Sequence, residues 1–266
     1  MNGELRLRTR RSNFKNSVDY ETMDKDKIPI KKVNLKEILS RVRSLGDPKR
    51  ARDLQRFFKT GPGEYGEGDV FLGLHVPEIR KLAKEYQALS LSIIIQLLHS
   101  PVHEIRLMAL LIMVRAYQKG DTALKERIYQ TYLQNTRVIN SWDLVDLSAD
   151  HIVGAHLSRV SYDPLQALTS SDLIWERRIA VIATFPLIKK GEFSKTLTIA
   201  QMLLQDPEDL IHKAVGWMLR EVGKRNQKTE ESFLKAHYKT MPRTMLRYAI
   251  EKFPENLRKR YLKGKI

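Results

Sequence analysis

The stretch Trp142-Asp143-Leu144-Val145-Asp146 opens one of four helical segments that share a pattern along the chain. In each segment a large or basic residue is followed three positions later by a small or aliphatic one. The four pairs are Arg106 with Ala109, Trp142 with Val145, Arg177 with Ala180, and Lys213 with Gly216. Their first members are 36, 35 and 36 residues apart, which indicates an internal repeat.

From Val33 onward, apolar residues recur every three or four positions with few alternating runs, a pattern that predicts helices almost throughout. The predicted helices cover residues 35–45, 48–59, 76–88, 91–99, 103–118, 121–134, 141–157, 172–187, 192–204, 208–225, 229–239, 242–252 and 255–263. With the repeat, they predict an all-α fold, a HEAT-like helical-repeat solenoid whose stacked helices form a concave face. Similarity between the units is weak, so a generic helical bundle is the alternative.

The composition narrows the classes of protein to consider. A chain of 266 residues with 42% hydrophobic content can build a substantial core. It has no cysteine, which excludes disulfides, thiol nucleophiles and cysteine zinc sites. No run approaches the roughly 18 apolar residues of a membrane span, and the N-terminus has no secretory pattern. We therefore expect a cytoplasmic protein without membrane association. The histidines show no metal-binding spacing, so we expect no metal and no cofactor.

The net charge of +16 is unevenly distributed. Residues 1–34 carry nine Lys or Arg against five acidic residues, and residues 236–266 carry nine against two. Such an excess attracts polyphosphates and makes binding sensitive to salt, although an anionic membrane or an acidic protein is an alternative partner. Residues 1–34 also lack a sustained apolar period. We predict that they form a basic, mobile extension to a single repeat domain over residues 35–266.

The helix predicted over residues 141–157 has a polar face. On a helical wheel that starts at Trp142, Asp146 lies about 40° away, Asp150 about 80° and Asp143 about 100°. The aliphatic residues occupy the opposite arc, so the wheel places the tryptophan and three carboxylates at the surface. For Asp143, a favourable position at the helix N-terminus is the simpler explanation. An aromatic ring beside a carboxylate on a basic protein suggests chemistry on nucleic acid.

Several segments carry a resemblance to a known family. The first three read Trp142-Asp143-Leu144-Val145-Asp146, Trp175-Glu176-Arg177-Arg178 and Lys213-Ala214-Val215-Gly216-Trp217-Met218-Leu219-Arg220-Glu221. Earlier ones read Lys59-Thr60-Gly61-Pro62-Gly63-Glu64-Tyr65-Gly66-Glu67-Gly68-Asp69, Phe71-Leu72-Gly73 and Val76-Pro77-Glu78-Ile79-Arg80. In this order and spacing they resemble the AlkD family of bacterial alkylpurine DNA glycosylases, over about residues 35–262.

The resemblance implies a solenoid that binds duplex DNA in its concave face and hydrolyses the bond between deoxyribose and an alkylated purine. It implies that Asp146 is the catalytic carboxylate and that Trp142 and Trp217 pack against the backbone of the lesion. Phe57 stands where the resemblance leads us to expect a tyrosine. A purine alkylated at N3 or N7 is cationic and already a good leaving group, so one carboxylate suffices to stabilise the oxocarbenium ion and orient water.

The resemblance also implies that Arg178 contacts the DNA backbone. We expect further DNA contacts from the basic residues at the recurring positions, which are Arg106, Arg177 and Lys213. The expected partner is double-stranded DNA with alkylated bases, bound by a monomer in the cytoplasm, at the bacterial nucleoid. Two alternatives are a non-catalytic helical-repeat scaffold and a lesion-sensing protein that binds alkylated DNA without releasing the base.

One further motif has a simpler explanation. Gly61, Gly63 and Gly66 have the spacing G-x-G-x-x-G, but no strand precedes them and the glutamates among them repel phosphate. We therefore predict a structural loop between two helices rather than a dinucleotide site. Tyr65, within this loop, is most simply a packing or surface residue.

Overall fold

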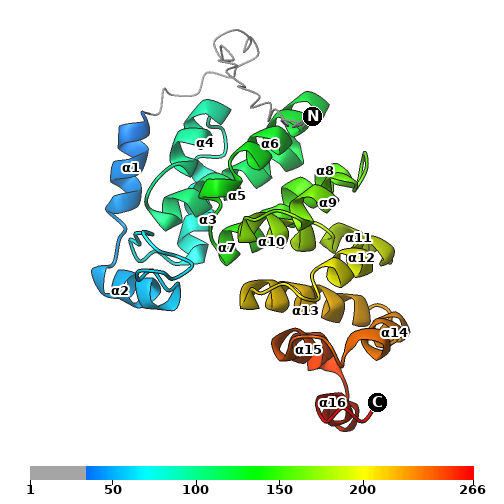
Figure 1. Ribbon diagram of the computed structural model, residues 1–266. Helices are drawn as coiled ribbons and strands as arrows, with labels where there is room; N and C mark the ends of the chain where they lie inside the picture. The colour runs from blue at the N-terminus through cyan, green and yellow to red at the C-terminus, as the bar shows by residue number, and fades with distance from the viewer. Residues whose placement is uncertain (1–33) are drawn as a thin grey trace, which may run out of the picture. The chain divides into compact units, whose positions relative to one another are not determined.

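A computed structural model describes residues 34–266 of the chain (Figure 1). The predicted extension, except for its last residue, lies outside the described residues. The α-helices are α1 Leu35–Arg43, α2 Pro48–Phe57, α3 Val76–Glu85, α4 Leu91–Leu98, α5 His103–Lys119, α6 Thr122–Gln134, α7 Trp142–Asp146, α8 Ala155–Leu157, α9 Pro164–Thr169, α10 Ile174–Ile182, α11 Phe185–Lys190, α12 Ser194–Met202, α13 Asp209–Gly223, α14 Gln227–His237, α15 Arg243–Ala249 and α16 Glu255–Leu262. Short 3-10 turns cover η1 Thr136–Val138 and η3 Ile250–Lys252, and a π turn covers η2 Asp150–Gly154.

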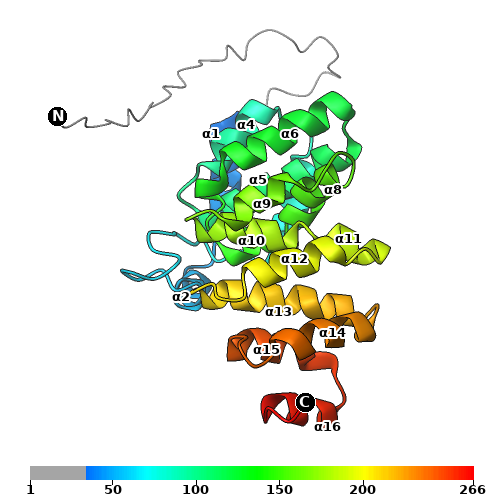
Figure 2. The ribbon, with the colours of Figure 1, turned by 45° about the vertical axis from the view of Figure 1, so that its right-hand side comes forward.

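The helices pack in chain order, as a helical-repeat solenoid requires. Helix α7 packs against α5 and α10, and α13 packs against α10 and α15. Figure 2 shows these layers following one another from α4 and α6 at one end to α16 at the other. The four recurring positions of the sequence fall on α5, α7, α10 and α13, one in each layer. The predicted all-α solenoid is therefore confirmed.

Two of the recurring arginines fix the loop that precedes their own helix. Arg106 on α5 and Arg177 on α10 each donate a hydrogen bond to the carbonyl six residues earlier, at 2.9 Å in both cases. Each also pairs with a buried carboxylate, Arg106 with Asp69 at 2.7 Å and Arg177 with Asp206 at 2.6 Å. The repeat thus marks a structural position, in which a guanidinium holds a helix to the loop before it.

Gly216, the second member of the fourth recurring pair, allows two layers to approach closely. A Cβ on this residue would lie 2.5 Å from the carbonyl oxygen of Met245 and 2.5 Å from the Cβ of Tyr248. Both residues belong to α15, which packs along α13. Glycine is therefore required here because the backbones of the two helices nearly touch.

The structure corrects two predicted helices. The segment predicted as one helix over residues 172–187 forms α10 and α11, because Pro186 has no amide hydrogen to continue the first helix. The helix predicted over residues 141–157 is interrupted after Asp146 and continues through the π turn η2 into α8. The short helix α9 was not predicted.

Candidate active site

Asp146 and Trp217 lie on the same cavity, which has a volume of about 370 Å³. The end of α7 and the π turn contribute Asp146, Asp150 and His151 to one part of its lining. Side chains of α3 and α5 line a second part, and side chains of α10, α11 and α13, including Trp217, line a third. The structure therefore brings together two of the three predicted catalytic residues.

Asp146 is held in place by Arg178 of α10. The guanidinium donates from Nε to Oδ1 at 2.9 Å and from Nη2 to Oδ2 at 2.8 Å, and its Nη1 donates to the carbonyl of Leu210. Arg178 is only 4% exposed, whereas the Asp146 side chain retains 15% exposure. Each of the three guanidinium nitrogens is thus bonded within the protein, with one N–H left on each of Nη1 and Nη2, and the contact of Arg178 with the DNA backbone stays a prediction.

The surroundings of Asp146 favour its neutral form more than water does. Burial raises the pKa of the Asp146 carboxyl above its ordinary value, and the positive charge of Arg178 opposes part of this rise. The wheel placed Asp143 and Asp150 at the surface beside it, but both are buried. Asp150 pairs with Lys189 at 3.3 Å, as Asp146 pairs with Arg178. Both carboxylates that line the cavity therefore have a cationic partner.

Trp142 belongs to an aromatic cluster and is not among the residues that line the cavity. Its ring stacks on Phe58 with centroids 5.3 Å apart and planes 11° apart, and it meets the ring of Phe57 edge-on at 6.1 Å. Its indole Nε1 donates a hydrogen bond to the hydroxyl of Tyr65 at 3.3 Å. The Phe57 side chain is 63% exposed, which is high for a phenylalanine. Trp142 is therefore fixed one helical turn before Asp146 by rings from the end of α2 and the loop that follows it.

Tyr65 is a site residue that sequence reasoning missed. The loop between α2 and α3 places its hydroxyl on Trp142 and its ring edge-on to Trp175, with centroids 6.2 Å apart. Glu64 and Glu67 accept hydrogen bonds from backbone amides of the same loop, at 2.9 and 2.8 Å. These carboxylates therefore shape the loop. The one signal in the sequence was the position of Tyr65 within a segment that carries the family resemblance.

A buried ionic network anchors both this loop and α7. His103 bonds Asp69 through Nδ1 and Asp143 through Nε2, both at 2.9 Å, and Arg106 bonds Asp69 at 2.7 Å. Ionised carboxylates only accept hydrogen bonds, so both ring nitrogens must donate and His103 is an imidazolium. Although burial lowers its pKa, the bonds to the two aspartates outweigh burial and raise the pKa of His103 to about 9. Arg106 is 4% exposed in this network, where it holds Asp69, and its contact with DNA stays a prediction.

The remaining predicted DNA contacts differ from each other. The Arg177 side chain is 12% exposed and is bound to Asp206, so it has a structural role like Arg106. The Lys213 side chain on α13 is 38% exposed and pairs with Asp209 at 2.8 Å. Of the four basic residues predicted to contact DNA, Lys213 is the one with substantial exposure.

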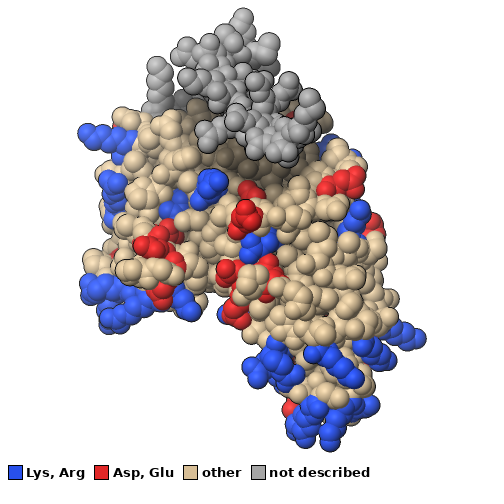
Figure 3. Space-filling model, viewed as in Figure 1, with Lys and Arg blue, Asp and Glu red and all other residues tan. Residues whose placement is uncertain are grey.

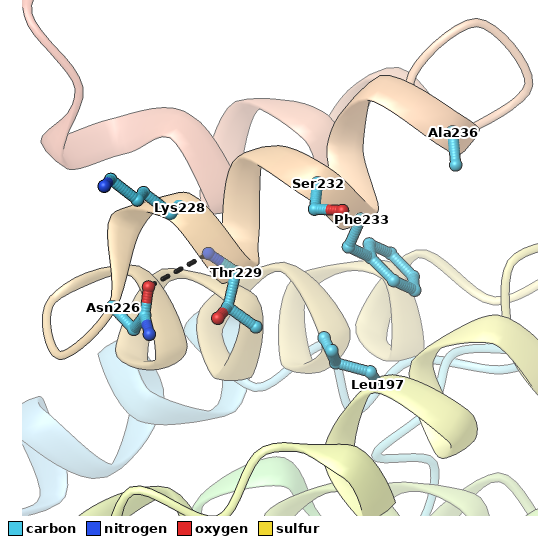
Figure 4. A pocket seen from close by; sticks show the side chains of 7 residues that line it. All are labelled: Leu197, Asn226, Lys228, Thr229, Ser232, Phe233 and Ala236. Atoms are coloured by element: carbon cyan, nitrogen blue, oxygen red, sulfur yellow. Dashed lines mark hydrogen bonds between the residues drawn. The ribbon is translucent and has the colours of Figure 1, made fainter.

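A larger cavity, of about 550 Å³, lies between α12 and α14 (Figure 4). Its lining residues are Leu197, Asn226, Lys228, Thr229, Ser232, Phe233 and Ala236. Asn226 accepts a hydrogen bond from the Thr229 amide at 3.1 Å and thereby caps α14. This lining contains one cationic side chain, Lys228, and no carboxylate, so it offers no group that could stabilise a developing positive charge as Asp146 could.

Metal-binding clusters and membrane-spanning helices are both absent from residues 34–266. This part of the chain contains no group of three or more histidine, aspartate or glutamate side chains arranged to hold a metal ion. None of its helices combines the length and apolar content needed to cross a membrane.

Comparisons with known proteins identify the family. The family described as DNA alkylation repair enzyme matches residues 38–253. A solved structure described as a predicted DNA alkylation repair enzyme from Enterococcus faecalis is similar, with a TM-score of 0.61, 18% identity, and coverage of 79% of this chain and 97% of that one. The crystal structure of AlkD2 from Streptococcus mutans is similar with a TM-score of 0.50, 15% identity, and coverage of 84% and 100%. No curated protein matches. Because the family match extends over most of its length, the chain belongs to the DNA alkylation repair enzyme family.

Proposed function

We propose that the protein is a DNA glycosylase that hydrolyses the N-glycosidic bond of purines alkylated at N3 or N7 in duplex DNA. Membership of the alkylation repair family supports the class of damage. The observation that carries the proposal is the Asp146 carboxylate, which Arg178 fixes on a cavity shared with Trp217.

The proposed reaction needs one carboxylate and no general acid. When the N-glycosidic bond breaks, its electron pair moves to the base, which leaves neutral because alkylation had made it cationic. The sugar becomes an oxocarbenium ion, water adds its hydroxyl to C1′ and releases a proton, and an abasic site remains. Asp146 would stabilise this cation and orient the water. Each of its oxygens accepts one bond from Arg178 and retains a further lone pair for these tasks.

The tryptophans would hold the sugar and backbone of the damaged nucleotide. Trp217 contributes its ring to the cavity, and Trp142 is fixed by Phe58 and Tyr65 one turn before Asp146. The face of an indole attracts cationic or polarised groups by about 0.5–2 kcal/mol when water is excluded. Such contacts favour a sugar on which positive charge develops.

The distribution of basic side chains supports duplex DNA as the partner. Figure 3 shows Lys and Arg gathered over α2 and over α15 and α16, with a hollow in the outline between them. The basic residues of these helices are Lys49, Arg50, Arg52, Arg56, Arg243, Arg247, Arg258, Lys259 and Arg260. Two cationic regions on either side of a hollow suit a polyanion that passes between them, and Lys213 adds a partly exposed cation on α13.

The test is release of 7-methylguanine from alkylated duplex DNA by the Asp146→Asn variant, at DNA concentrations that give equal occupancy. We expect the rate to fall by about 100-fold or more, as for removal of one group that stabilises developing charge. Asp206→Asn is the matched control, since it also removes the carboxylate partner of an α10 arginine, Arg177, but lies outside the cavity lining. Equal rates for wild type and Asp146→Asn would remove Asp146 from the mechanism. Preferential binding of alkylated DNA without base release by the wild type would identify a lesion sensor instead.

A further inference from the structure

Two arginines on the cavity have no partner within the described part of the protein. Arg80 of α3 and Arg115 of α5 both line it, together with Gln118 one turn after Arg115. Arg80 is exposed and Arg115 is half-buried. Among residues 34–266, neither arginine forms a hydrogen bond or an ion pair. Arginine side chains at a cavity that lack a counter-ion attract an anion, since the cavity concentrates their charge.

The other charged groups of the cavity do not neutralise these arginines. Asp146 is bound by Arg178 through both oxygens, and Asp150 is bound by Lys189. Lys189 also lies 4.1 Å from the ring centroid of Phe185, which holds it on α11. With both carboxylates paired, the cavity has an excess of positive charge on the side formed by α3 and α5.

The side formed by α11 and α13 has a different character. Phe185 and Trp217 line it, with ring centroids 6.3 Å apart. The cavity therefore combines guanidinium groups on one side, a fixed carboxylate, and two aromatic rings on the other side. A planar guanidinium presents paired donors that match the oxygens of a phosphate, whereas an aromatic face suits the C–H groups of a sugar. This arrangement fits one sugar-phosphate unit of a nucleic acid strand.

We propose that Arg80 and Arg115 bind a phosphodiester of the damaged strand, next to the nucleotide whose sugar meets Asp146 and Trp217. This inference rests on the proposed function for the identity of that nucleotide. The two arginines would set the register of the strand, so that the glycosidic bond to be broken faces the carboxylate. They contact the substrate at the phosphate and take no part in bond breaking.

Binding of duplex DNA that contains a tetrahydrofuran abasic analogue tests the site without any need for turnover. The variants are Arg80→Gln, Arg115→Gln and the double variant. Each neutralised phosphate contributes about 0.9 to the slope of log K against log salt. Because both arginines contact the same phosphodiester, the double variant should lose about 0.9. Arg127→Gln is the matched control, because Arg127 is an exposed arginine on α6 outside the cavity lining. A double variant with the wild-type slope would overturn the proposal.

A neutral phosphate locates the contact on the DNA. A single methylphosphonate is placed in turn at each phosphate flanking the analogue, and the affinity of each duplex is measured. We expect wild type to lose affinity at one position, and the double variant to lose nothing more at that position. Equal losses for wild type and the double variant at every position would exclude the predicted contact. If the phosphate is located in this way but wild type releases no base, the phosphate site stands and the proposed glycosylase activity fails.

Discussion

The pairing of Arg178 with Asp146 makes a quantitative prediction for the variant Arg178→Gln. The change removes two charge-assisted bonds, at 2.9 and 2.8 Å, and the bond to the carbonyl of Leu210. It leaves a carboxylate whose side chain is 15% exposed without its counter-ion. The stability of the variant therefore measures how strongly the site disfavours an isolated negative charge.

Removing one partner of a buried ion pair costs about 3–5 kcal/mol. Because Asp146 retains some contact with solvent, we expect about 3 kcal/mol of lost unfolding free energy at neutral pH. In the variant, only burial and neighbouring carboxylates act on the pKa of Asp146, and both raise it. A folded-state pKa above the unfolded value means that the penalty applies to the ionised form and shrinks as the pH falls through the folded pKa. Each unit of pKa difference changes the penalty by about 1.4 kcal/mol.

The assay is urea unfolding followed by tryptophan fluorescence, in buffers at about pH 8 and about pH 5, with linear extrapolation to water. The double variant Arg178→Gln/Asp146→Asn should be more stable than the sum of the single changes predicts, by about 1 kcal/mol or more, because it leaves no buried charge. A loss below about 1 kcal/mol for Arg178→Gln, or the same loss at both pH values, would refute the reasoning that Asp146 is desolvated.

Three further predictions concern the supports of the site. Tyr65→Phe removes the acceptor for Trp142, so base release at saturating DNA should slow about threefold to tenfold, equivalent to about 0.5–1.5 kcal/mol; an unchanged rate would show that this bond does not position the ring. The pKa of His103 is raised from 6.5 to about 9, so its contribution to stability is fully present below about pH 6.5 and is lost as the pH rises through about 9. Unfolding free energies across this range should fall for wild type, and a His103→Gln variant with the same pH dependence would contradict the assignment. Gly216→Ala forces the two packed helices apart and should cost about 1–3 kcal/mol, with a lower Tm; an unaltered Tm would argue against the close approach of α13 to Tyr248 on α15.

The solenoid could be predicted because the residues that build its repeat recur in the sequence. Arg106 and Arg177 hold equivalent loops two repeats apart, and Gly216, three residues after the recurring Lys213, provides a close approach in the fourth repeat. Residues that have the same structural role in each repeat recur at the same interval in the sequence. The break between α10 and α11 has a local signal in Pro186, whereas the interruption after Asp146 leaves no such signal in the sequence.

The candidate site was only partly predictable because a helical wheel contains no tertiary partners. It placed Asp143 at the surface, but His103, 40 residues earlier, bonds this aspartate in the interior. The wheel also gave no sign that Arg178 bonds Asp146, 32 residues away. The sequence around Tyr65 and the sequence around Trp142 do not indicate that the two side chains meet, since the residues are 77 positions apart.

The π turn that follows Asp146 has a genetic consequence. A π turn contains one more residue than the α-helical turn it replaces, and η2 spans Asp150–Gly154. Deleting one residue there would restore the α-helical period and rotate Trp142 and Asp146 by about 100° relative to α8. The sequences of the helices in the neighbouring layers would not change, nor would the contacts that these helices make outside the rotated segment. Under the proposed function, the loss of a single codon is thus a short route to a relative that keeps the architecture and lacks the glycosylase reaction.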